Sequence, residues 1–411
     1  MTLLTSTDGQ TGLPRYFKSV FAQASHMGYG RLDVVLPDGR RFCATGAQPG
    51  QAAEVRIHND DALARLVREG ELGFAEAYIE GWWSTPDLQA LMDVIFRDNP
   101  ALLDEFTGIG LVRAYEKLRH WLRGNSRAQA RKNIAQHYDI GNDFYALWLD
   151  DSMTYSSALF KTGQESLERA QEQKYAALVD SLALKPGDHV LEIGCGWGGF
   201  AEYAALHRGL KVTALTISKA QQEFAVARMQ RAGLADRVQI KLQDYRDETG
   251  VYDAIASIEM LEAVGEAYWP TYFATLRDRL KAGGRATVQV ITVPDARFAL
   301  YRRNVDFIQK YIFPGGMLIS PGRFGDEARR AGLGWDAAIT FGESYSQTLR
   351  RWHERFTAAW PRIQTLRQPG IAGATYDTRF RRMWEFYLTS CAGAFHTGIC
   401  DVTQITLRRP V

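Results

Sequence analysis

The chain of 411 residues is long enough for one large domain and a smaller one, and its 46% apolar and 23% charged residues are typical of a globular protein. A formal net charge of +2 gives no reason to expect nucleic acid or another polyanion as a partner. Four cysteines without CxxC or paired-histidine spacing argue against a zinc site and a disulfide framework. We therefore expect no metal and a location in the reducing cytoplasm. Neither a signal peptide nor an apolar run of about 18 residues is visible.

The amino-terminal part contains a hairpin pattern followed by helical patterns. The stretch RLDVVLPDGRRFCATG has two strand-like runs around a Pro-Asp-Gly turn, which predicts a β-hairpin. The stretch DDALARLVREGELGFAEAYIEGWW then predicts helices that break at Gly70 and Gly73. The helical pattern continues to about residue 105. We therefore expect residues 1–105 to form a small α+β domain without a catalytic signature.

Residues 106–135 differ from the preceding part by their basic character. Apolar residues recur at helical spacing, and a single acid, Glu116, stands among many bases. These bases are Arg113, Lys117, Arg119, Arg123, Arg127, Arg131 and Lys132. The pattern predicts a basic amphipathic linker helix, which either lies on an anionic lipid surface or exposes a solvated basic face.

Residues 136–411 contain a repeated strand and helix pattern. From about residue 186, the short apolar runs HVLEIG, KVTALTIS, VQIKLQDY, YDAIASIE and RATVQVITV alternate with helix-like stretches. This alternation predicts parallel βαβ units and an α/β, Rossmann-like, doubly wound sheet. The last third is rich in aromatic residues and arginine, and we expect it to form a helical lid.

The turn after the first predicted strand, VLEIGCGWGGF, lacks side chains at several positions. Gly194, Gly196, Gly198 and Gly199 leave the backbone bare where a doubly wound sheet meets its ligand. The spacing also fits the GxGxxG pattern of dinucleotide-binding proteins. The glycines alone therefore leave the ligand open between a dinucleotide and another nucleotide-like molecule.

Two features favour S-adenosylmethionine over a dinucleotide. Glu192 precedes the first glycine by two residues, an arrangement that resembles class I methyltransferases. The second strand ends in ALTISKAQ, without the carboxylate that would hold the ribose of a dinucleotide. Thr216 and Gln221 are available for the ribose in its place.

Several stretches together resemble one family. In chain order they are AQHYDIGNDFYALWLDDSMTYSSALF, VLEIGCGWGGFAEYAA, LTISKAQQ, LQDYRD, SIEMLEAVG, YIFPGG and WHERFTAAWP. From about residue 132 to the carboxyl terminus, this set resembles the cyclopropane-fatty-acyl-phospholipid synthases and the mycolic acid cyclopropane synthases. The resemblance implies that residues 136–411 form an S-adenosylmethionine-dependent methyltransferase domain with an acyl-chain pocket. The implied cofactor contacts are Tyr155, Ser156, Glu192, Gly194, Gly196, Gly198, Thr216, Gln221, Tyr245 and Arg246.

The resemblance also implies a chemistry. The π electrons of a cis alkene attack an electrophilic methyl group, which leaves a carbocation, and a bound bicarbonate acts as the base. The positions that match the bicarbonate ligands, and that we take as the catalytic set, are Ser157, Glu262, Gln289, Ile291 and Tyr345. The family has cysteine at the first of these positions and histidine at the third, whereas glutamine cannot titrate. Glu259 adds a second carboxyl beside Glu262, where a small residue is usual.

We therefore expect methylation of the cis double bond of unsaturated phospholipid acyl chains at the inner membrane surface, by a cytoplasmic, peripheral enzyme. The product is either a cyclopropane or a methyl-branched or methylene acyl chain, and Gln289 and Glu259 favour the second kind. Two rival functions are a small-molecule N- or O-methyltransferase and a non-catalytic protein that binds lipid and S-adenosylmethionine. Homo-oligomer formation is left open.

Overall fold

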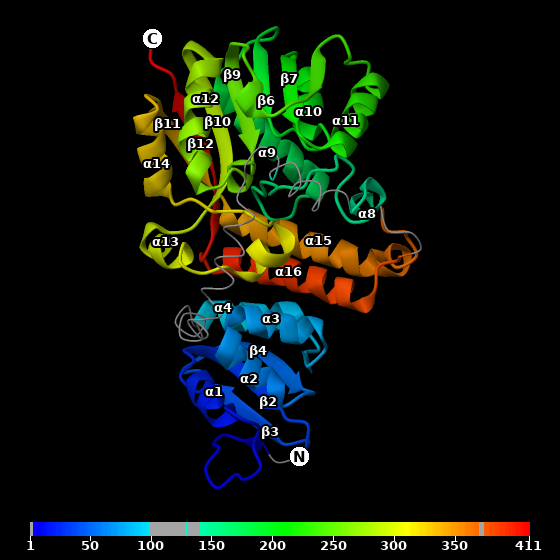
Figure 1. Ribbon diagram of the computed structural model, residues 1–411, viewed down its shortest axis with the longest axis vertical. Coiled ribbons are helices and arrows are strands. Elements are labelled where there is room, and N and C mark those ends of the chain that lie inside the picture. Colours follow the sequence, from blue (N-terminus) through cyan, green and yellow to red (C-terminus); the bar gives the residue numbers. More distant parts are fainter. Residues whose placement is uncertain (1–2, 99–128, 130–139, 370–373) are drawn as a thin grey trace. The chain divides into compact units, whose positions relative to one another are not determined.

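The computed structural model describes residues 3–98, 129, 140–369 and 374–411, which form two compact units (Figure 1). Among these residues, the first unit comprises 3–98, 302–312 and 376–399, and the second unit takes the rest. Two segments of the expected 136–411 domain thus belong to the first unit. Apart from Gln129, the predicted basic helix of residues 106–135 lies outside the described residues.

The first unit is built on a five-stranded sheet in the order β1-β3-β2-β4-β5. Its strands are β1 (Leu3–Leu4), β2 (Tyr29–Val35), β3 (Arg41–Thr45), β4 (Gln48–Ile57) and β5 (Trp83–Ser84). Its α-helices are α1 (Phe17–Ala24), α2 (Asp61–Glu69), α3 (Glu71–Ile79), α4 (Leu88–Asp98) and α16 (Thr378–His396). Strands β2 and β3 pair antiparallel, so the predicted hairpin is confirmed. Helix α4 packs against β4 and against α16.

The two predicted helix breaks have different outcomes. Gly70 separates α2 from α3 with a φ of 67°, as expected, because glycine adopts this left-handed conformation at little cost. The predicted break at Gly73 is wrong, since Gly73 lies inside α3. A Cβ atom at Gly73 would lie 2.4 Å from the carbonyl oxygen of Arg65. This glycine therefore permits the close approach of α2 and α3 and does not end a helix.

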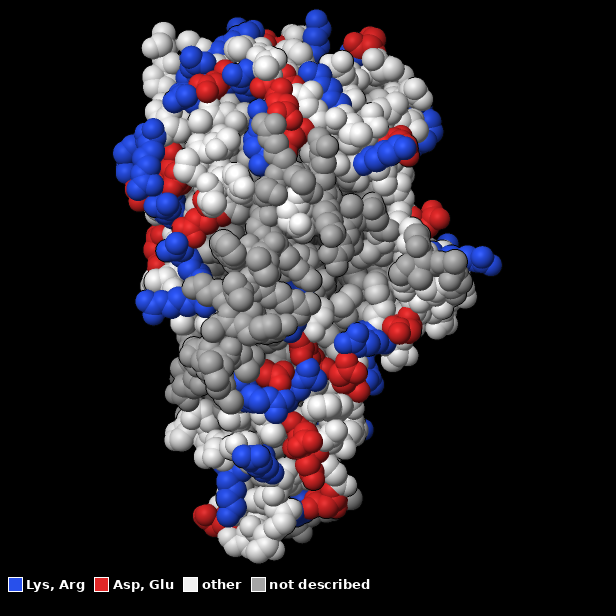
Figure 2. Space-filling view, in the orientation of Figure 1, with Lys and Arg blue, Asp and Glu red and all other residues white. Residues whose placement is uncertain are grey.

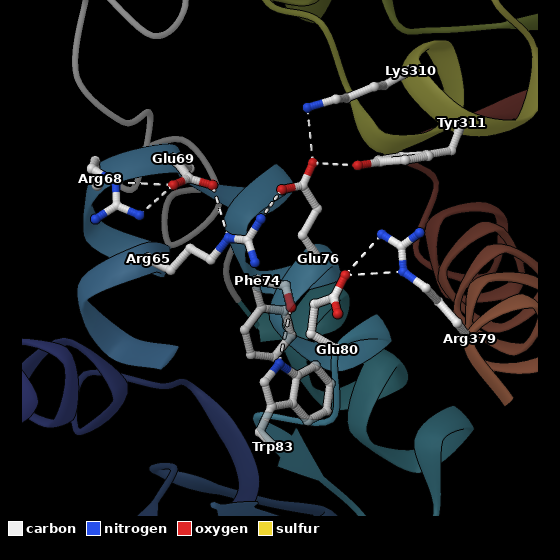
Figure 3. A network of polar contacts seen from close by, with 10 residues as sticks. All are labelled: Arg65, Arg68, Glu69, Phe74, Glu76, Glu80, Trp83, Lys310, Tyr311 and Arg379. Atoms are coloured by element: carbon white, nitrogen blue, oxygen red, sulfur yellow. Dashed lines mark hydrogen bonds and ion pairs between the residues drawn. The ribbon is translucent and has the colours of Figure 1, made fainter. Parts of the chain in front are cut away.

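A buried ion network joins α2 and α3 to a short π-helix, η4 (Ile308–Ile312), of the same unit (Figure 3). The carboxylate of Glu76 accepts hydrogen bonds from Arg65, from Lys310 Nζ at 2.8 Å and from Tyr311 Oη at 2.6 Å. Burial alone would raise the pKa of Glu76, but Lys310 and Tyr311 outweigh burial and hold that pKa below its ordinary value. The pairing with two cations keeps this carboxylate ionised.

The second unit contains a seven-stranded sheet in the order β11-β12-β10-β9-β6-β7-β8. Its strands are β6 (His189–Ile193), β7 (Lys211–Thr216), β8 (Val238–Leu242), β9 (Tyr252–Ile258), β10 (Leu280–Thr292), β11 (Gly334–Thr340) and β12 (Asp401–Arg408). The first five are the predicted strands, and they pair in parallel. Strand β12 runs antiparallel to β10 and β11. The predicted α/β class is confirmed, whereas β11 and β12 were not predicted.

Helices cover both faces of this sheet. Along β6, Val190 packs in a hydrophobic cluster with Phe200 of α10, and the next residue, Leu191, packs in a second cluster with Phe273 of α12. Because successive side chains of a strand point to opposite faces, the two clusters lie on opposite sides. The α-helices of this unit are α8 (Asn142–Ala146), α9 (Leu167–Leu182), α10 (Gly199–Arg208), α11 (Lys219–Arg231), α12 (Trp269–Arg279), α13 (Asp295–Tyr301), α14 (Pro321–Arg330) and α15 (Gly342–Ile363). Its 3-10 helices are η1 (Tyr245–Asp247), η2 (Leu261–Ala263) and η3 (Glu266–Tyr268).

Within the described parts of the chain, no helix combines the length and the apolar character needed to cross a bilayer.

Candidate active site

A cavity of about 180 Å³ opens in the second unit at the carboxyl ends of β6, β7 and β9. Nearly all of the predicted cofactor residues line it: Tyr155, Ser156, Glu192, Gly194, Gly196, Thr216, Gln221, Tyr245 and Arg246. Gly198 does not line the cavity, although the next residue, Gly199, does. The N–H of Gly198 donates to the carbonyl of Cys195 at 2.9 Å, and its φ is 84°. Gly198 therefore closes the turn, whereas its neighbours face the cavity.

The glycine turn leaves space beside a buried carboxyl. Gly194 and Gly196 have φ values of 87° and 51°, and a Cβ atom at Gly196 would meet nothing within 4 Å. Glu192 lies in the same wall, and its Oε2 has no hydrogen-bond partner among the described residues. Burial raises the pKa of Glu192 to about 8. An unpartnered buried carboxyl beside bare backbone fits a cationic group such as the ammonium of S-adenosylmethionine.

The far side of the cavity carries hydroxyl, amide and aromatic groups. Thr216 Oγ1 donates to Gln221 Oε1 at 3.0 Å, which orients this amide at the end of β7. Arg246 donates two hydrogen bonds, of 2.8 and 2.6 Å, to Asp244, and its guanidinium carbon lies 5.7 Å from the centre of the Tyr245 ring. Asp244, which follows β8 and holds Arg246 in place, was not predicted.

The loop before α9 supplies the third wall. Ser156 Oγ accepts a hydrogen bond from Lys174 Nζ at 2.7 Å, and Lys174 is fully buried in α9. Burial lowers the pKa of Lys174 to about 8 against the opposing influence of Glu259. The ring of Tyr155 packs 5.3 Å from that of Trp352. Lys174 was not predicted, because a lysine inside an amphipathic helix gives no sequence signal of burial.

The five predicted catalytic residues come together around two carboxyls. Ser157 N donates to Glu259 Oε1 at 2.7 Å, Gln289 Nε2 donates to the same oxygen at 2.7 Å, and Tyr345 Oη donates to Glu259 Oε2 at 2.5 Å. The other two predicted catalytic residues bind each other, since Ile291 N donates to Glu262 Oε1 at 2.6 Å. Glu262 Oε2 has no hydrogen-bond partner within the described structure.

These two carboxyls differ in their surroundings. Burial, together with the nearby charge of Glu259, raises the pKa of Glu262 to about 8. Burial also raises the pKa of Glu259, but Tyr345 and Lys174 act in the opposite direction. Neutral donors thus bind both oxygens of Glu259, whereas only one oxygen of Glu262 has a partner within the described structure. Among the described residues, no group of histidine, cysteine, aspartate and glutamate side chains is arranged to hold a metal ion.

Gln289 has a fixed orientation. Its Oε1 accepts a hydrogen bond from Gln404 Nε2 at 3.0 Å, and Gln404 lies opposite it in the β10–β12 register. This bond turns the amide nitrogen of Gln289 toward Glu259. The orienting residue was missed because β12 itself was not predicted.

The aromatic residues of the last third do not line this cavity. They divide between the two units, with Phe307, Tyr311, Trp384, Phe386 and Tyr387 in the first and Phe313, Trp352, Phe356 and Trp360 in the second. Within the first unit, Phe307 lies 5.0 Å from Phe386 between ring centres. The acyl-chain pocket remains a prediction.

Comparisons with known proteins identify the family. Residues 125–405 match the family described as mycolic acid cyclopropane synthetase. The sequence is 40% identical to the tuberculostearic acid methyltransferase UfaA1 of Mycobacterium tuberculosis, and the match covers 92% of this chain and 88% of that protein. It is 37% identical to the cyclopropane-fatty-acyl-phospholipid synthase of Escherichia coli K12, over 87% of this chain and 88% of that protein.

A solved structure gives the same result for the fold. The mycolic acid cyclopropane synthase CmaA1, complexed with SAH and CTAB, superposes with a TM-score of 0.62 at 28% identity, covering 68% of this chain and 98% of CmaA1. The predicted family and the predicted cofactor are thus confirmed. The chain belongs to the mycolic acid cyclopropane synthetase family and is an S-adenosylmethionine-dependent methyltransferase.

Proposed function

We propose that this enzyme modifies lipid acyl chains by methylating the cis double bond of an unsaturated phospholipid, and that the product is a methyl-branched or methylene acyl chain. The observation that carries the proposal is a pair of half-buried carboxyls, of which Glu259 lines the cofactor cavity and Glu262 is held by the N–H of Ile291. Transfer to an alkene creates a carbocation, which needs a nearby negative charge and a base in a site without water. Two neighbouring half-buried carboxyls with raised pKa values can supply the base.

The cofactor residues have separable roles in this proposal. Bound S-adenosylmethionine supplies an electrophilic methyl group. Glu192, with its unpartnered oxygen, would hold the ammonium, and Thr216 and Gln221 would hold the ribose. Tyr245 and Arg246 would contact the adenine, and Asp244 fixes the Arg246 guanidinium by two hydrogen bonds. The bare backbone at Gly196 lets the ligand approach the turn.

The site residues favour the branched or methylene product. Gln289 cannot accept a proton, so proton loss from the cation depends on the carboxyls. A hydride shift toward the first cationic carbon, followed by proton loss, gives an alkene, whereas direct proton loss with ring closure gives a cyclopropane. The relative with 40% identity is named a tuberculostearic acid methyltransferase, which supports methylation of a fatty acid, and the Escherichia coli relative is named for the cyclopropane product.

Attachment to the membrane surface is proposed from the basic segment 106–135. In Figure 2, basic and acidic residues are interspersed over the described surface, so the described residues form no continuous basic face in that view. Reversing the charges at Arg119, Arg123 and Arg127 should reduce the binding of the full chain to vesicles of anionic lipid, in a salt-dependent way. Binding that is insensitive to salt and to these changes would leave the segment as a linker.

The function is tested with a deuterated methyl donor and vesicles of an unsaturated phosphatidylglycerol. The released fatty acids are analysed by mass spectrometry and NMR. We expect deuterium in the acyl chain together with alkene signals. A saturated product that retains two deuteriums and carries a ring contradicts the proposed product. Label only in headgroups or soluble amines supports the small-molecule rival, and cofactor binding without any transfer supports the non-catalytic one.

A further inference from the structure

We infer that Glu259 is the general base of this enzyme, and that its carboxylate stands in place of the separate bicarbonate that the family resemblance implies. The inference rests on the proposed function, because a base is required only if methyl transfer leaves a carbocation. Its consequence is specific: the enzyme carries its base in its own chain and turns over without bicarbonate.

The first support is the set of groups that bind Glu259. Three of the five positions that match bicarbonate ligands, Ser157, Gln289 and Tyr345, donate hydrogen bonds to its two oxygens at 2.7, 2.7 and 2.5 Å. A carboxylate presents the same planar pair of oxygens as bicarbonate, so one set of donors serves either group. Since these donors already bind Glu259, a free bicarbonate would have to compete with a tethered carboxylate for them.

The second support is the backbone at Glu259. This residue directly follows β9, and its φ of 96° lies in the region that favours glycine. A side chain in this conformation costs about 1–2 kcal/mol, and burying a carboxyl adds to the cost. The backbone N–H of Glu259 donates to the carbonyl of Gln289 at 3.1 Å, which holds the strained residue against β10. Strain combined with a buried charge beside a cofactor cavity is typical of a functional residue.

The third support is the charge around Glu259. The titratable groups that act on it are Glu262, Tyr345 and Lys174. The only hydrogen bond found for the Lys174 ammonium in the described structure goes to Ser156 Oγ, so the nearest cation is not paired directly with Glu259. The three groups that donate to Glu259 are neutral, so they do not cancel the charge that its carboxylate would present to the carbocation. Glu259 lines the cofactor cavity and Glu262 does not, so Glu262 is the weaker candidate for the base.

The step balances in atoms and charge. After the methyl group has joined one alkene carbon and a hydride has moved to the other, the cation is on the carbon that bears the methyl group. Glu259 takes a proton from that methyl group, and the electron pair of the broken C–H bond forms the new C=C bond. The neutral Glu259 then releases its proton to water when the product leaves.

The experiment compares the wild-type enzyme and Glu259→Gly in buffer stripped of carbon dioxide, with and without added bicarbonate. Glycine suits the left-handed backbone and opens the space that the carboxylate fills. We expect the wild-type rate of acyl methylation to be unchanged by bicarbonate. We expect Glu259→Gly to lose about a hundredfold or more without bicarbonate and to recover at least about tenfold, saturably, when bicarbonate is added.

A binding measurement gives a readout that does not depend on turnover. NMR of carbon-13 bicarbonate should detect binding to the Glu259→Gly variant and not to the wild-type enzyme. Both proteins should bind S-adenosylhomocysteine. The matched control is Ala183→Gly at the end of α9, which also has a positive φ, 53°, but carries no carboxyl. This variant should keep the wild-type rate in both buffers.

The outcomes separate the base from the function. A wild-type rate that falls more than about tenfold without bicarbonate, or a Glu259→Gly variant that is fully active without it, overturns the assignment of Glu259 and leaves acyl methylation standing. Absence of methyl transfer to the acyl chain by the wild-type enzyme in both buffers overturns the proposed function and the base together.

Discussion

The two units bury carboxyl groups in opposite ways. In the first unit, Glu76 binds Arg65 and Lys310, and its pKa lies below the ordinary value (Figure 3). In the second unit, Glu259 binds neutral donors and Glu262 binds a single backbone N–H, and both pKa values lie above it. Burial acts on all three groups, so the difference comes from the partners.

This difference separates a structural role from a chemical one. Arg65 and Lys310 neutralise the charge of Glu76. These ion pairs hold α2, α3 and the π-helix η4 together but leave no net negative charge to bind a ligand. Neutral donors stabilise a carboxylate without cancelling its charge, so it can still attract a cation and accept a proton. The partners of a buried carboxyl are thus more informative than its burial.

The largest effect is expected at the catalytic carboxyls. Glu262→Gln should lower turnover about a thousandfold, because the amide, unlike the carboxyl, cannot exchange a proton in the site. The amide oxygen still accepts from Ile291 N, so the fold should persist. Turnover is measured with labelled methyl donor and phospholipid vesicles, and cofactor binding by calorimetry. Unchanged turnover would remove Glu262 from the mechanism.

Glu76→Gln tests the other side of the comparison. The change leaves Arg65 and Lys310 close together without their counter-charge, so the first unit should lose about 3 kcal/mol of unfolding free energy. Urea denaturation measures this loss, and the double variant with Lys310→Met should recover part of it. The S-adenosylhomocysteine affinity of the folded protein should not change. A loss of affinity without a loss of stability would contradict the structural role.

The pH dependence of stability should have opposite signs for the two kinds of carboxyl. Glu262 keeps its proton in the folded state up to pH of about 8, whereas the unfolded chain releases it near 4.5. Its contribution to stability therefore falls as pH rises through this window, by up to about 1.4 kcal/mol per pH unit. The stabilisation from Glu76 is present above about pH 4.5 and is lost as pH falls below that value.

The measurement is the unfolding free energy of wild-type protein and Glu262→Gln between about pH 5 and pH 8. The difference between the two proteins isolates Glu262, because Glu192 contributes a slope of the same sign to both. The wild-type protein should lose stability more steeply with rising pH. Parallel curves would show that Glu262 has an ordinary pKa.

The smallest effect is expected at the glycines. Gly196→Ala places a methyl group in the open space of the cavity and should weaken S-adenosylhomocysteine binding about fivefold, or about 1 kcal/mol. Gly73→Ala is the matched change in the first unit, where the methyl group would overlap Arg65 O. It should lower the melting temperature and leave the affinity unchanged. Calorimetry and thermal unfolding distinguish the two, and equal affinities for both variants would contradict the ligand-facing role of Gly196.

Local patterns predicted the parallel strands and the glycine turn, because both are properties of short stretches, whereas the family resemblance implied Tyr155, Ser156, Tyr245 and Arg246. The same reasoning missed β11, whose residues are exposed throughout and show no alternation. It also placed a helix break at Gly73, since close packing between two helices leaves no mark in the sequence around one glycine. The first error reflects long-range strand pairing, and the second reflects packing between two consecutive helices.

The candidate site was also only partly predictable from the sequence. The resemblance brought Ser157, Gln289, Ile291 and Tyr345 together, and the structure places them around two carboxyls. The sequence showed Glu259 only as an additional acid. Its partners come from residues 102, 30 and 86 positions away along the chain, so their convergence is visible only in three dimensions.

The left-handed backbone at Glu259 also has an evolutionary consequence. A glutamate codon becomes a glycine codon by one nucleotide change, and at this position that change would relieve about 1–2 kcal/mol of strain. If stability alone were under selection, glycine would soon replace glutamate at this position. Persistence of glutamate in a lineage would therefore record continuous selection on catalysis, and a descendant that lost it would depend on dissolved carbon dioxide for its proton acceptor.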